Sequence, residues 1–108
     1  MITIQDFKKV ELKVGKIVKV EDHPDADKLM ILRVDVGEDK LRTLVAGLKD
    51  YYADEELEGK YTVVVTNLEP ARLRGVRSEG MVLAAQESED KVIILSPEEP
   101  VEPGSPVL

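Results

Sequence analysis

Residues 11–20 read ELKVGKIVKV. The apolar side chains fall on alternate positions: Leu12, Val14, Val18 and Val20. This period of two is typical of a β-strand with one buried face. Gly15 and Lys16 interrupt the alternation, and a glycine inside a long first strand favours a bulge or a sharp bend. Such a bend would allow a small sheet to close into a barrel.

More strands are predicted downstream, on both sides of a short helical stretch. Apolar runs with strand periodicity occupy residues 29–36, 41–46, 61–66, 81–85 and 92–95. Residues 37–40 form a hairpin turn after the first of these runs, whose apolar side chains share one side: Met30, Leu32, Val34 and Val36. Residues 48–58 suit one or two helical turns.

Three strands, a helical connection and two further strands follow the order of an OB-fold. The sequence therefore predicts a mainly all-β chain, built as a five-stranded Greek-key barrel with short helices and a C-terminal extension. Another small barrel or a sandwich is the alternative. We expect residues 1–108 to be a single domain, because a chain of this length matches one ordinary domain.

The two chain ends carry their own signals. Thr3 can cap a short helix that carries Phe7 toward the core. The last stretch, about 96–108, contains four prolines: Pro97, Pro100, Pro103 and Pro106. Proline cannot donate to a central ladder, so this tail is predicted to be extended and wrapped on the barrel.

Composition excludes several classes of function. The chain has no Cys and one His, which removes thiol chemistry and any catalytic triad, and no cofactor site is predicted. No apolar segment near the start is long enough for a signal peptide or a membrane span, so we expect a cytoplasmic protein that does not contact membranes. The balance of 15 Lys and Arg against 22 Asp and Glu gives a net charge of -7 and argues against a generic nucleic-acid coat.

Residues 23–29, HPDADKL, gather one imidazole and two carboxylates. A catalytic zinc needs three protein ligands, and the chain offers neither a second His nor a Cys. A turn is the better interpretation, with Pro24 fixing it and Asp25 or Asp27 hydrogen-bonding the backbone. Lys28 is either a solvated lysine at a strand edge or a contact to phosphate.

Residues 67–81, NLEPARLRGVRSEGM, join the fourth and fifth predicted strands. They form either an ordinary surface loop anchored by its apolar residues or a site for a polyanion. Arg72, Arg74 and Arg77 favour the second reading, because each guanidinium can pair with a phosphate through two hydrogen bonds. Asn67 and Ser78 add neutral groups able to reach sugar hydroxyls or base edges.

Five segments together resemble the tRNA-binding-domain family of OB-folds: 23–29, 45–48, 67–75, 78–85 and Pro103-Gly104. The family includes the C-terminal domain of bacterial methionyl-tRNA synthetases and the free-standing archaeal beta subunits. The resemblance runs from about Phe7 to Gly104. It implies recognition of the shape of folded tRNA, without catalysis, and contact roles for six residues: Lys28, Asn67, Arg72, Arg74, Ser78 and Met81.

The resemblance also implies partners. It predicts a homodimer formed through the chain ends, with Ile2, Ile4 and Val101 buried across a two-fold axis. A catalytic methionyl-tRNA synthetase chain is a further expected partner. The alternative is a protein-interaction module that tethers a synthetase without binding RNA, which the acidic surface would allow. Glu69 and Glu79 flank the arginines and depart from the charge of a typical tRNA binder.

Overall fold

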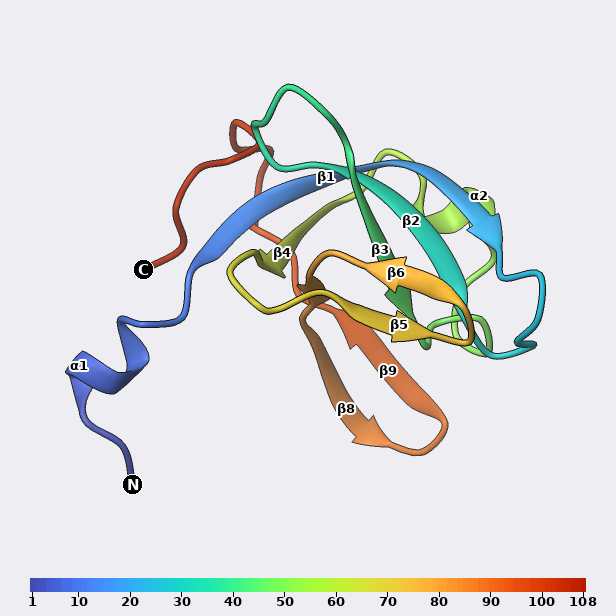
Figure 1. Ribbon diagram of the computed structural model, residues 1–108, viewed down its shortest axis with the longest axis horizontal. Coiled ribbons are helices and arrows are strands. Elements are labelled where there is room, and N and C mark those ends of the chain that lie inside the picture. Colours follow the sequence, from blue (N-terminus) through green and yellow to red (C-terminus); the bar gives the residue numbers. More distant parts are fainter.

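One antiparallel sheet forms most of a nearly closed barrel in the computed structural model, which describes residues 1–108 (Figure 1). Its strand order is β3-β2-β1-β4-β7. The strands are β1 Leu12–Asp22, β2 Met30–Asp35, β3 Arg42–Ala46, β4 Tyr61–Val65 and β7 Met81–Val82. The mainly β, OB-like five-stranded barrel predicted from the sequence is confirmed.

Two separate ribbons and two short helices complete the chain. Strands β5 Ala71–Leu73 and β6 Val76–Ser78 form one ribbon, and β8 Ala84–Ser88 and β9 Lys91–Ile94 form the other. The helices are α1 Ile4–Phe7 and α2 Asp54–Leu57. The predicted strand at 81–85 is thus divided at Leu83, and its second half pairs with the last strand. The β8–β9 ribbon projects from the barrel in Figure 1. No helix combines the length and the apolar character that a membrane span needs.

The interruption in β1 lies later than predicted. Ile17 pairs with Val34 and Lys19 pairs with Arg33, so Val18 is the extra residue of a bulge. Because a bulge shifts the alternation by one, Ile17 is fully buried and Val18 is 48% exposed. The expectation that Val18 shares the buried face was therefore wrong. Gly15 instead allows close packing, since a Cβ there would lie 2.7 Å from the Val34 side chain.

The core fills the inside of the barrel. The predicted apolar side of β2 is confirmed, because none of its four members is more than 1% exposed: Met30, Leu32, Val34 and Val36. They pack with Ile17, Leu44 and Val64 and with Leu48 and Leu57 from the stretch around α2. Burial of this apolar surface is the main force that holds the barrel together.

Helix α1 begins at the predicted cap but does not reach the core. The Thr3 hydroxyl accepts from the Asp6 N–H at 3.1 Å, and the Asp6 carboxylate accepts from the Thr3 N–H at 3.3 Å. Phe7, however, is 43% exposed, and no residue of α1 is buried. Figure 1 shows the reason, since α1 stands apart from the barrel beyond the start of β1. The prediction that Phe7 enters the core was wrong.

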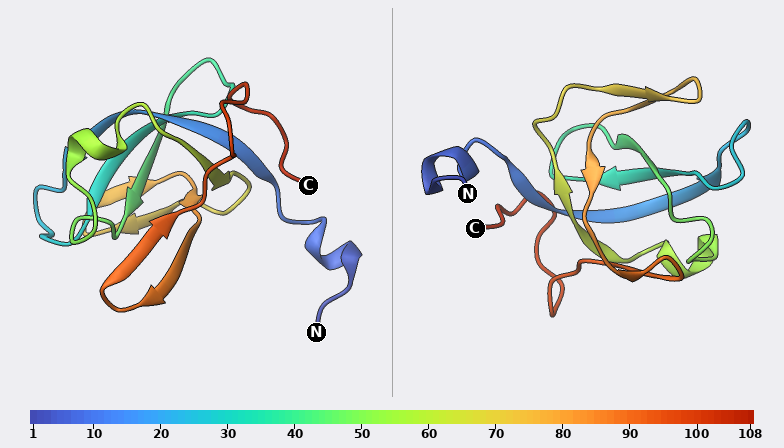
Figure 2. Two further views of the ribbon diagram at one scale, coloured as in Figure 1. Left: turned by 180° about the vertical axis from the view of Figure 1, so that it is seen from behind. Right: turned by 90° about the horizontal axis from the view of Figure 1, so that it is seen from below.

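The C-terminal tail is extended and runs beside the first half of β1. The Val14 N–H donates to the Ser105 carbonyl at 2.9 Å, and the Val107 N–H donates to the Leu12 carbonyl at 2.9 Å. Pro106 pairs with Lys13 without needing an N–H of its own. Both chain ends consequently lie on the same side of the barrel in Figures 1 and 2.

Side chains close the gap beside β3. The Val45 N–H donates to the Ser78 hydroxyl at 2.9 Å, and the Thr43 N–H donates to the Glu79 carboxylate at 3.1 Å. Arg42 adds a clamp, because its guanidinium binds the Glu38 carboxylate through two bonds of 2.8 Å and also donates to the carbonyls of Thr66 and Glu79. This edge of β3 is therefore held by these side chains and by one backbone bond, from the Glu79 N–H to the Thr43 carbonyl at 2.8 Å, where a neighbouring strand would otherwise pair.

The clamp makes stability depend on pH. The hydrogen bond from Arg42 lowers the pKa of Glu38 below its usual range. A carboxylate with a lowered pKa in the folded state contributes stability at neutral pH and loses it as the pH falls through that pKa. We expect Glu38→Gln to reduce the free energy of unfolding at pH 7 by about 0.5 to 1 kcal/mol, a small effect because screening weakens a pair whose Glu38 side chain is 41% exposed.

The check is denaturant unfolding of the wild-type protein and Glu38→Gln between pH 7 and the acid limit of the fold. The two curves should converge in acid, where Glu38 is protonated and its contribution is gone. Glu11 also has a lowered pKa, because of its hydrogen bond with Thr66, and it contributes equally to both curves. A difference that stays constant across this range would contradict the role given to Glu38.

Candidate nucleic-acid interface

Residues 71–78 form a two-stranded ribbon with an Arg74-Gly75 turn, here called the arginine ribbon. Leu73 pairs with Val76 on either side of the turn, and Arg72 pairs with Arg77 one step further away. Arg74 has φ 52° and Gly75 has φ 88°. Positive φ at both central residues is the signature of a type I′ hairpin turn, whose twist matches that of the flanking strands. The segment predicted as a loop is thus an ordered hairpin.

The arginine ribbon has two different faces. Ala71, Leu73 and Ser78 face a depression of about 190 Å³ that they share with residues of β3 and β7. Arg72 and Arg77 lie on the opposite face, where they line an open depression with Pro70. This separation follows from the pleat, because successive side chains of a strand point to opposite faces.

The arginines of this ribbon have no acidic partner. None of the ion pairs in the structure involves Arg72, Arg74 or Arg77. The Arg72 guanidinium makes only a long contact of 3.3 Å with the Gly75 carbonyl. Glu79 is directed to Thr43 on β3 and does not neutralise them. Like charges directly opposite each other destabilise a ribbon, so an anion bound between Arg72 and Arg77 would relieve this repulsion.

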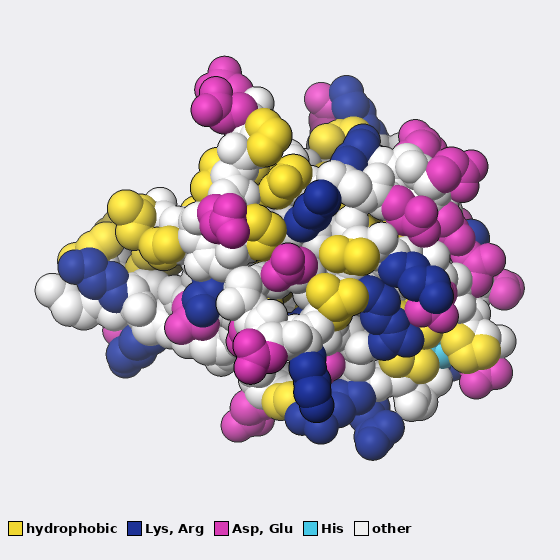
Figure 3. All heavy atoms as spheres, turned by 90° about the horizontal axis from the view of Figure 1, so that it is seen from above, with side chains coloured by type: hydrophobic (Ala, Val, Ile, Leu, Met, Phe, Trp, Pro, Cys, Tyr) yellow, Lys and Arg dark blue, Asp and Glu magenta, His cyan; other side chains and the backbone are white.

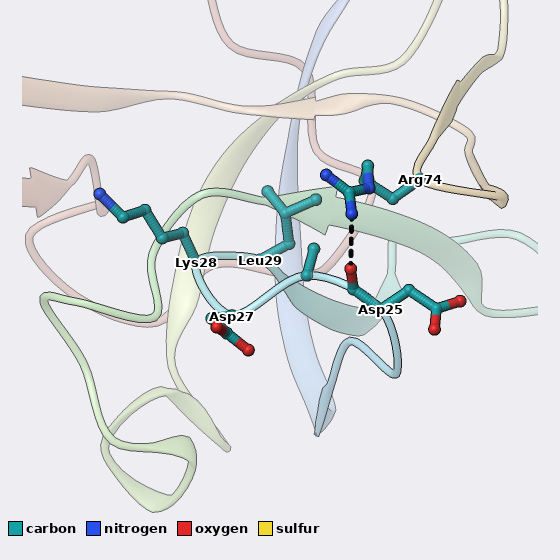
Figure 4. A pocket seen from close by; sticks show the side chains of 6 residues that line it. Asp25, Asp27, Lys28, Leu29 and Arg74 are labelled. Carbon is teal, nitrogen blue, oxygen red and sulfur yellow. Dashed lines mark hydrogen bonds between the residues drawn. The ribbon is translucent and has the colours of Figure 1, made fainter.

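Arg74 reaches away from this pair, over the turn between β1 and β2. Its guanidinium donates to the Asp25 carbonyl at 3.1 Å (Figure 4). Lys28 lines the same depression but points away from Arg74 in Figure 4. The Lys28 ammonium is 3.9 Å from the Asp50 carboxylate in an exposed and therefore weak pair. Arg74 and Lys28 thus add positive charge near the ribbon tip without converging on one point.

Met81 lies on the surface beside the arginine ribbon. Its side chain is 48% exposed, and it lines an apolar depression with Leu73 and Val45. Met81 is therefore accessible on the Leu73 face of the ribbon, opposite the face that carries Arg72 and Arg77.

Two predicted site residues lie elsewhere or are buried. The exposed Asn67 side chain holds the segment before β1, since it accepts from the Glu11 N–H at 2.8 Å and donates to the Lys9 carbonyl at 2.7 Å. Ser78 is buried, and its hydroxyl donates to the Gly80 carbonyl at 3.0 Å while accepting from Val45. The structure therefore places neither side chain beside the arginines as a free group.

The turn at residues 23–29 is held differently from the prediction. Asp25 or Asp27 was expected to bind the backbone through its carboxylate, and neither does so. The His23 ring takes this role, because its Nδ1 accepts from the Asp25 N–H at 3.0 Å and its Nε2 lies 2.9 Å from the Leu73 carbonyl. Both ring nitrogens are therefore occupied by backbone groups.

Arg77 was one of the three arginines that favour a polyanion site, but it was not among the six predicted contacts. The signal that could have paired it with Arg72 is the dipeptide Arg74-Gly75, as the centre of a two-residue turn. Counting outward from this turn pairs Leu73 with Val76 and then Arg72 with Arg77, as the register shows. Reading the segment as a loop conceals this pairing.

Positive and negative side chains are unevenly distributed over the surface. In Figure 3 several Lys and Arg side chains cluster at the lower centre and right of the visible face, and Asp and Glu are dense along the right margin, while both signs also occur elsewhere on this face. Figure 2 (right) shows the arginine ribbon at one edge of the barrel and α2, with acidic residues throughout its first turn, at the opposite edge. At cellular salt, charges more than about 10 Å apart are largely screened, so the net charge does not cancel the local field of the ribbon.

A small OB-like barrel with a ribbon of exposed arginines that have no acidic partner has the features of a polyanion-binding module. Residues 12–106 match the family model described as a putative tRNA binding domain, and the chain belongs to this family. The predicted relationship to methionyl-tRNA synthetase is confirmed. The methionine–tRNA ligase of Pyrococcus furiosus is 53% identical over 106 residues, which are 98% of this chain and 14% of the relative.

Solved structures agree with this assignment. A protein described as related to methionyl-tRNA synthetase from Pyrococcus horikoshii superposes with a TM-score of 0.92 at 37% identity, covering 100% of this chain and 98% of the other. The chaperone CsaA of Bacillus anthracis superposes with a TM-score of 0.90 at 28% identity, covering 100% and 99%. The chain thus spans a small part of the curated ligase but nearly all of each of these two structures.

Proposed function

We propose that this chain binds folded tRNA through the arginine ribbon. It would act as a homodimeric, non-catalytic accessory domain of an aminoacyl-tRNA synthetase in the cytoplasm, the methionyl enzyme being the partner. The observation that carries the proposal is the cross-strand pair Arg72 and Arg77, exposed on one face of the ribbon without a carboxylate. Two planar guanidiniums in this arrangement suit the phosphates of a nucleic-acid backbone.

The chemistry of the surface favours folded RNA over a single strand. Sequence-independent binding of single strands relies on aromatic side chains that stack on bases. Here Tyr51 and Tyr52 pack on the core, and their hydroxyls bind the backbone of the β8–β9 ribbon. Contacts to phosphates and 2′-hydroxyls need no such platform. Of the six predicted contacts, we retain Arg72, Arg74, Lys28 and Met81, add Arg77, and assign Asn67 and Ser78 to positioning the segment.

The homodimer would form through the chain ends. Ile4, Phe7 and Val10 line an apolar groove with Val107 and Leu108 from the tail. Ile2 and Ile4 are also largely exposed. A contiguous apolar patch of this kind is typical of a protein–protein interface, and a second copy presents the same complementary patch. Dimerisation would bring two arginine ribbons to one RNA or to one synthetase complex and so raise the apparent affinity.

We propose a non-catalytic role because of the residues that the chain offers for catalysis. The single His has both ring nitrogens committed to backbone groups, and the surface around the ribbon holds no nucleophile activated by a neighbouring base. Residues 1–108 would therefore work as one binding unit, with aminoacylation carried out by a separate catalytic domain or chain.

A titration of the wild-type protein with folded tRNA at several salt concentrations tests the proposal. If each site engages about three phosphates, log affinity should fall against log salt with a slope of roughly -2 to -3. A single-stranded RNA of equal length is the control, and it should bind more weakly because the proposal relies on shape. Absence of salt-dependent tRNA binding would favour the alternative, a module that tethers a synthetase by protein contacts alone.

A further inference from the structure

The two ends of the arginine ribbon are attached to the barrel in different ways. At the strand ends, Ser78 and Glu79 bind the edge of β3 through three hydrogen bonds with Thr43 and Val45. The tip at Arg74 and Gly75 lies far from these contacts along the ribbon. There the hydrogen bonds to the barrel are two side-chain contacts, from Arg74 to the Asp25 carbonyl and from His23 to the Leu73 carbonyl, beside the apolar side chain of Leu73.

The hydrogen-bond partners of His23 define its tautomer. Its Nδ1 accepts from the Asp25 N–H and must therefore carry a lone pair. The proton of the neutral ring then lies on Nε2, which donates to the Leu73 carbonyl at 2.9 Å. One imidazole thus joins the turn at residues 23–25 to the ribbon, between Arg72 and Arg74.

We propose that His23 is a positioning residue of the RNA interface, an inference that rests on the proposed function. His23 holds the ribbon tip against the barrel, so that the arginines on both sides of Leu73 meet the RNA backbone from a fixed place. The ring is only 6% exposed and does not itself touch a ligand at the surface.

Physical reasoning supports a role in affinity. An isolated hairpin with three-residue strands is marginal in water, and the repulsion between Arg72 and Arg77 weakens it further. A tip that moves freely must be ordered when RNA binds, and this ordering reduces the affinity. Fixing the tip in advance removes part of that cost without adding a contact to the RNA.

Three substitutions of His23 distinguish the hydrogen bond made by its Nε2 from the one made by its Nδ1. In His23→Gln the side-chain amide can still donate from the position of Nε2, whereas His23→Asn can keep only the acceptor at the position of Nδ1, and His23→Ala keeps neither. We expect His23→Ala and His23→Asn to weaken tRNA binding about 5- to 10-fold, in line with the loss of one hydrogen bond, and to leave the slope of the salt dependence unchanged, because no phosphate contact is lost. His23→Gln should stay within about twofold of wild type, because it restores that bond.

A matched control is Tyr51→Phe. Tyr51 donates to the Glu89 carbonyl at 2.8 Å and ties the other ribbon, β8–β9, to the barrel. Like His23→Ala and His23→Asn, Tyr51→Phe loses one hydrogen bond from a side chain to a carbonyl, but at a ribbon without arginines. The affinity for tRNA should therefore not change. Thermal unfolding of every variant, followed by circular dichroism, measures any general loss of stability.

The outcomes separate the inference from the function it rests on. Wild-type protein without salt-dependent tRNA binding would refute the proposed function. Wild-type binding with unchanged affinity in His23→Ala would overturn only the inference. The inference would also be overturned if His23→Gln lost as much affinity as His23→Ala while unfolding at the wild-type temperature. The same would follow if Tyr51→Phe lost as much affinity as His23→Ala. Recovery in His23→Gln alone supports it, even when His23→Ala unfolds at a lower temperature.

Discussion

Replacing Arg72 and Arg77 together with alanine is expected to weaken tRNA binding about 150-fold or more at low salt, since each charged hydrogen-bonding group contributes about 1.5 to 3 kcal/mol. The slope of log affinity against log salt should become less steep by about 1.5 to 2, because two phosphates lose their partners. The change should not unfold the ribbon, since it removes two like charges that face each other. Filter binding over a range of salt concentrations measures both quantities.

The control must change the net charge by the same amount. Lys9 and Lys91 are exposed, each pairs with a nearby carboxylate, and neither belongs to the arginine ribbon. Replacing both with alanine should leave the affinity within about twofold, because screening limits distant surface charges. If this variant lost as much affinity as the arginine variant, binding would depend on total charge and not on the ribbon. A third variant, Arg72→Lys with Arg77→Lys, keeps the charge but loses the planar fork.

Phe7→Glu is expected to convert the dimer into monomers. In the proposed dimer Phe7 is covered by the second copy, and a carboxylate buried there without a partner costs several kcal/mol. The mass from light scattering should fall to that of one 12.0 kDa chain. Affinity for tRNA should fall with it, by roughly 10-fold or more if two ribbons engage one RNA.

Val18→Glu is the matched control for this change. Val18 is 48% exposed and Phe7 is 43% exposed, but Val18 sits on the bulge of β1, away from the groove between the chain ends. The same substitution there should leave the mass and the tRNA affinity unchanged. A wild-type protein that is already monomeric at micromolar concentration would contradict the proposed dimer directly.

The sequence predicted the barrel well because period-two patterns are local. The strand β2 and its buried side chains follow directly from alternation, and so does the tail, whose prolines restrict it to an extended path. The position of the bulge could not be read in this way. Alternation alone places Val18 inside, and only the pairing of Ile17 with Val34 across the sheet shows that it lies outside. Phe7 was misplaced for a similar reason, since an apolar residue in a short helix looks the same whether it faces a core or a partner.

The sequence indicated which cationic side chains of the candidate site are exposed, but not which of its polar side chains are buried or bonded within the fold. Free arginines in a glycine-containing segment correctly marked an exposed cationic element, because guanidiniums are seldom buried without partners. Ser78 and Asn67 are polar and lie in the same segment, yet each makes a hydrogen bond with a residue distant in the sequence, Val45 and Lys9 respectively. The sequence of the segment alone does not show whether a hydroxyl is hydrogen-bonded within the barrel or free to bind a ligand.

At Arg74 the residue that best suits the left-handed backbone differs from the residue that the proposed RNA interface needs. Type I′ turns favour Asn-Gly, because asparagine tolerates a positive φ more easily than most residues. Arginine at φ 52° is a costlier choice, of the kind that proteins retain at working surfaces. Directed evolution for heat resistance alone would therefore drift toward asparagine at this corner of the hairpin and discard a cation. Screening such libraries for RNA affinity in parallel would be needed to keep it.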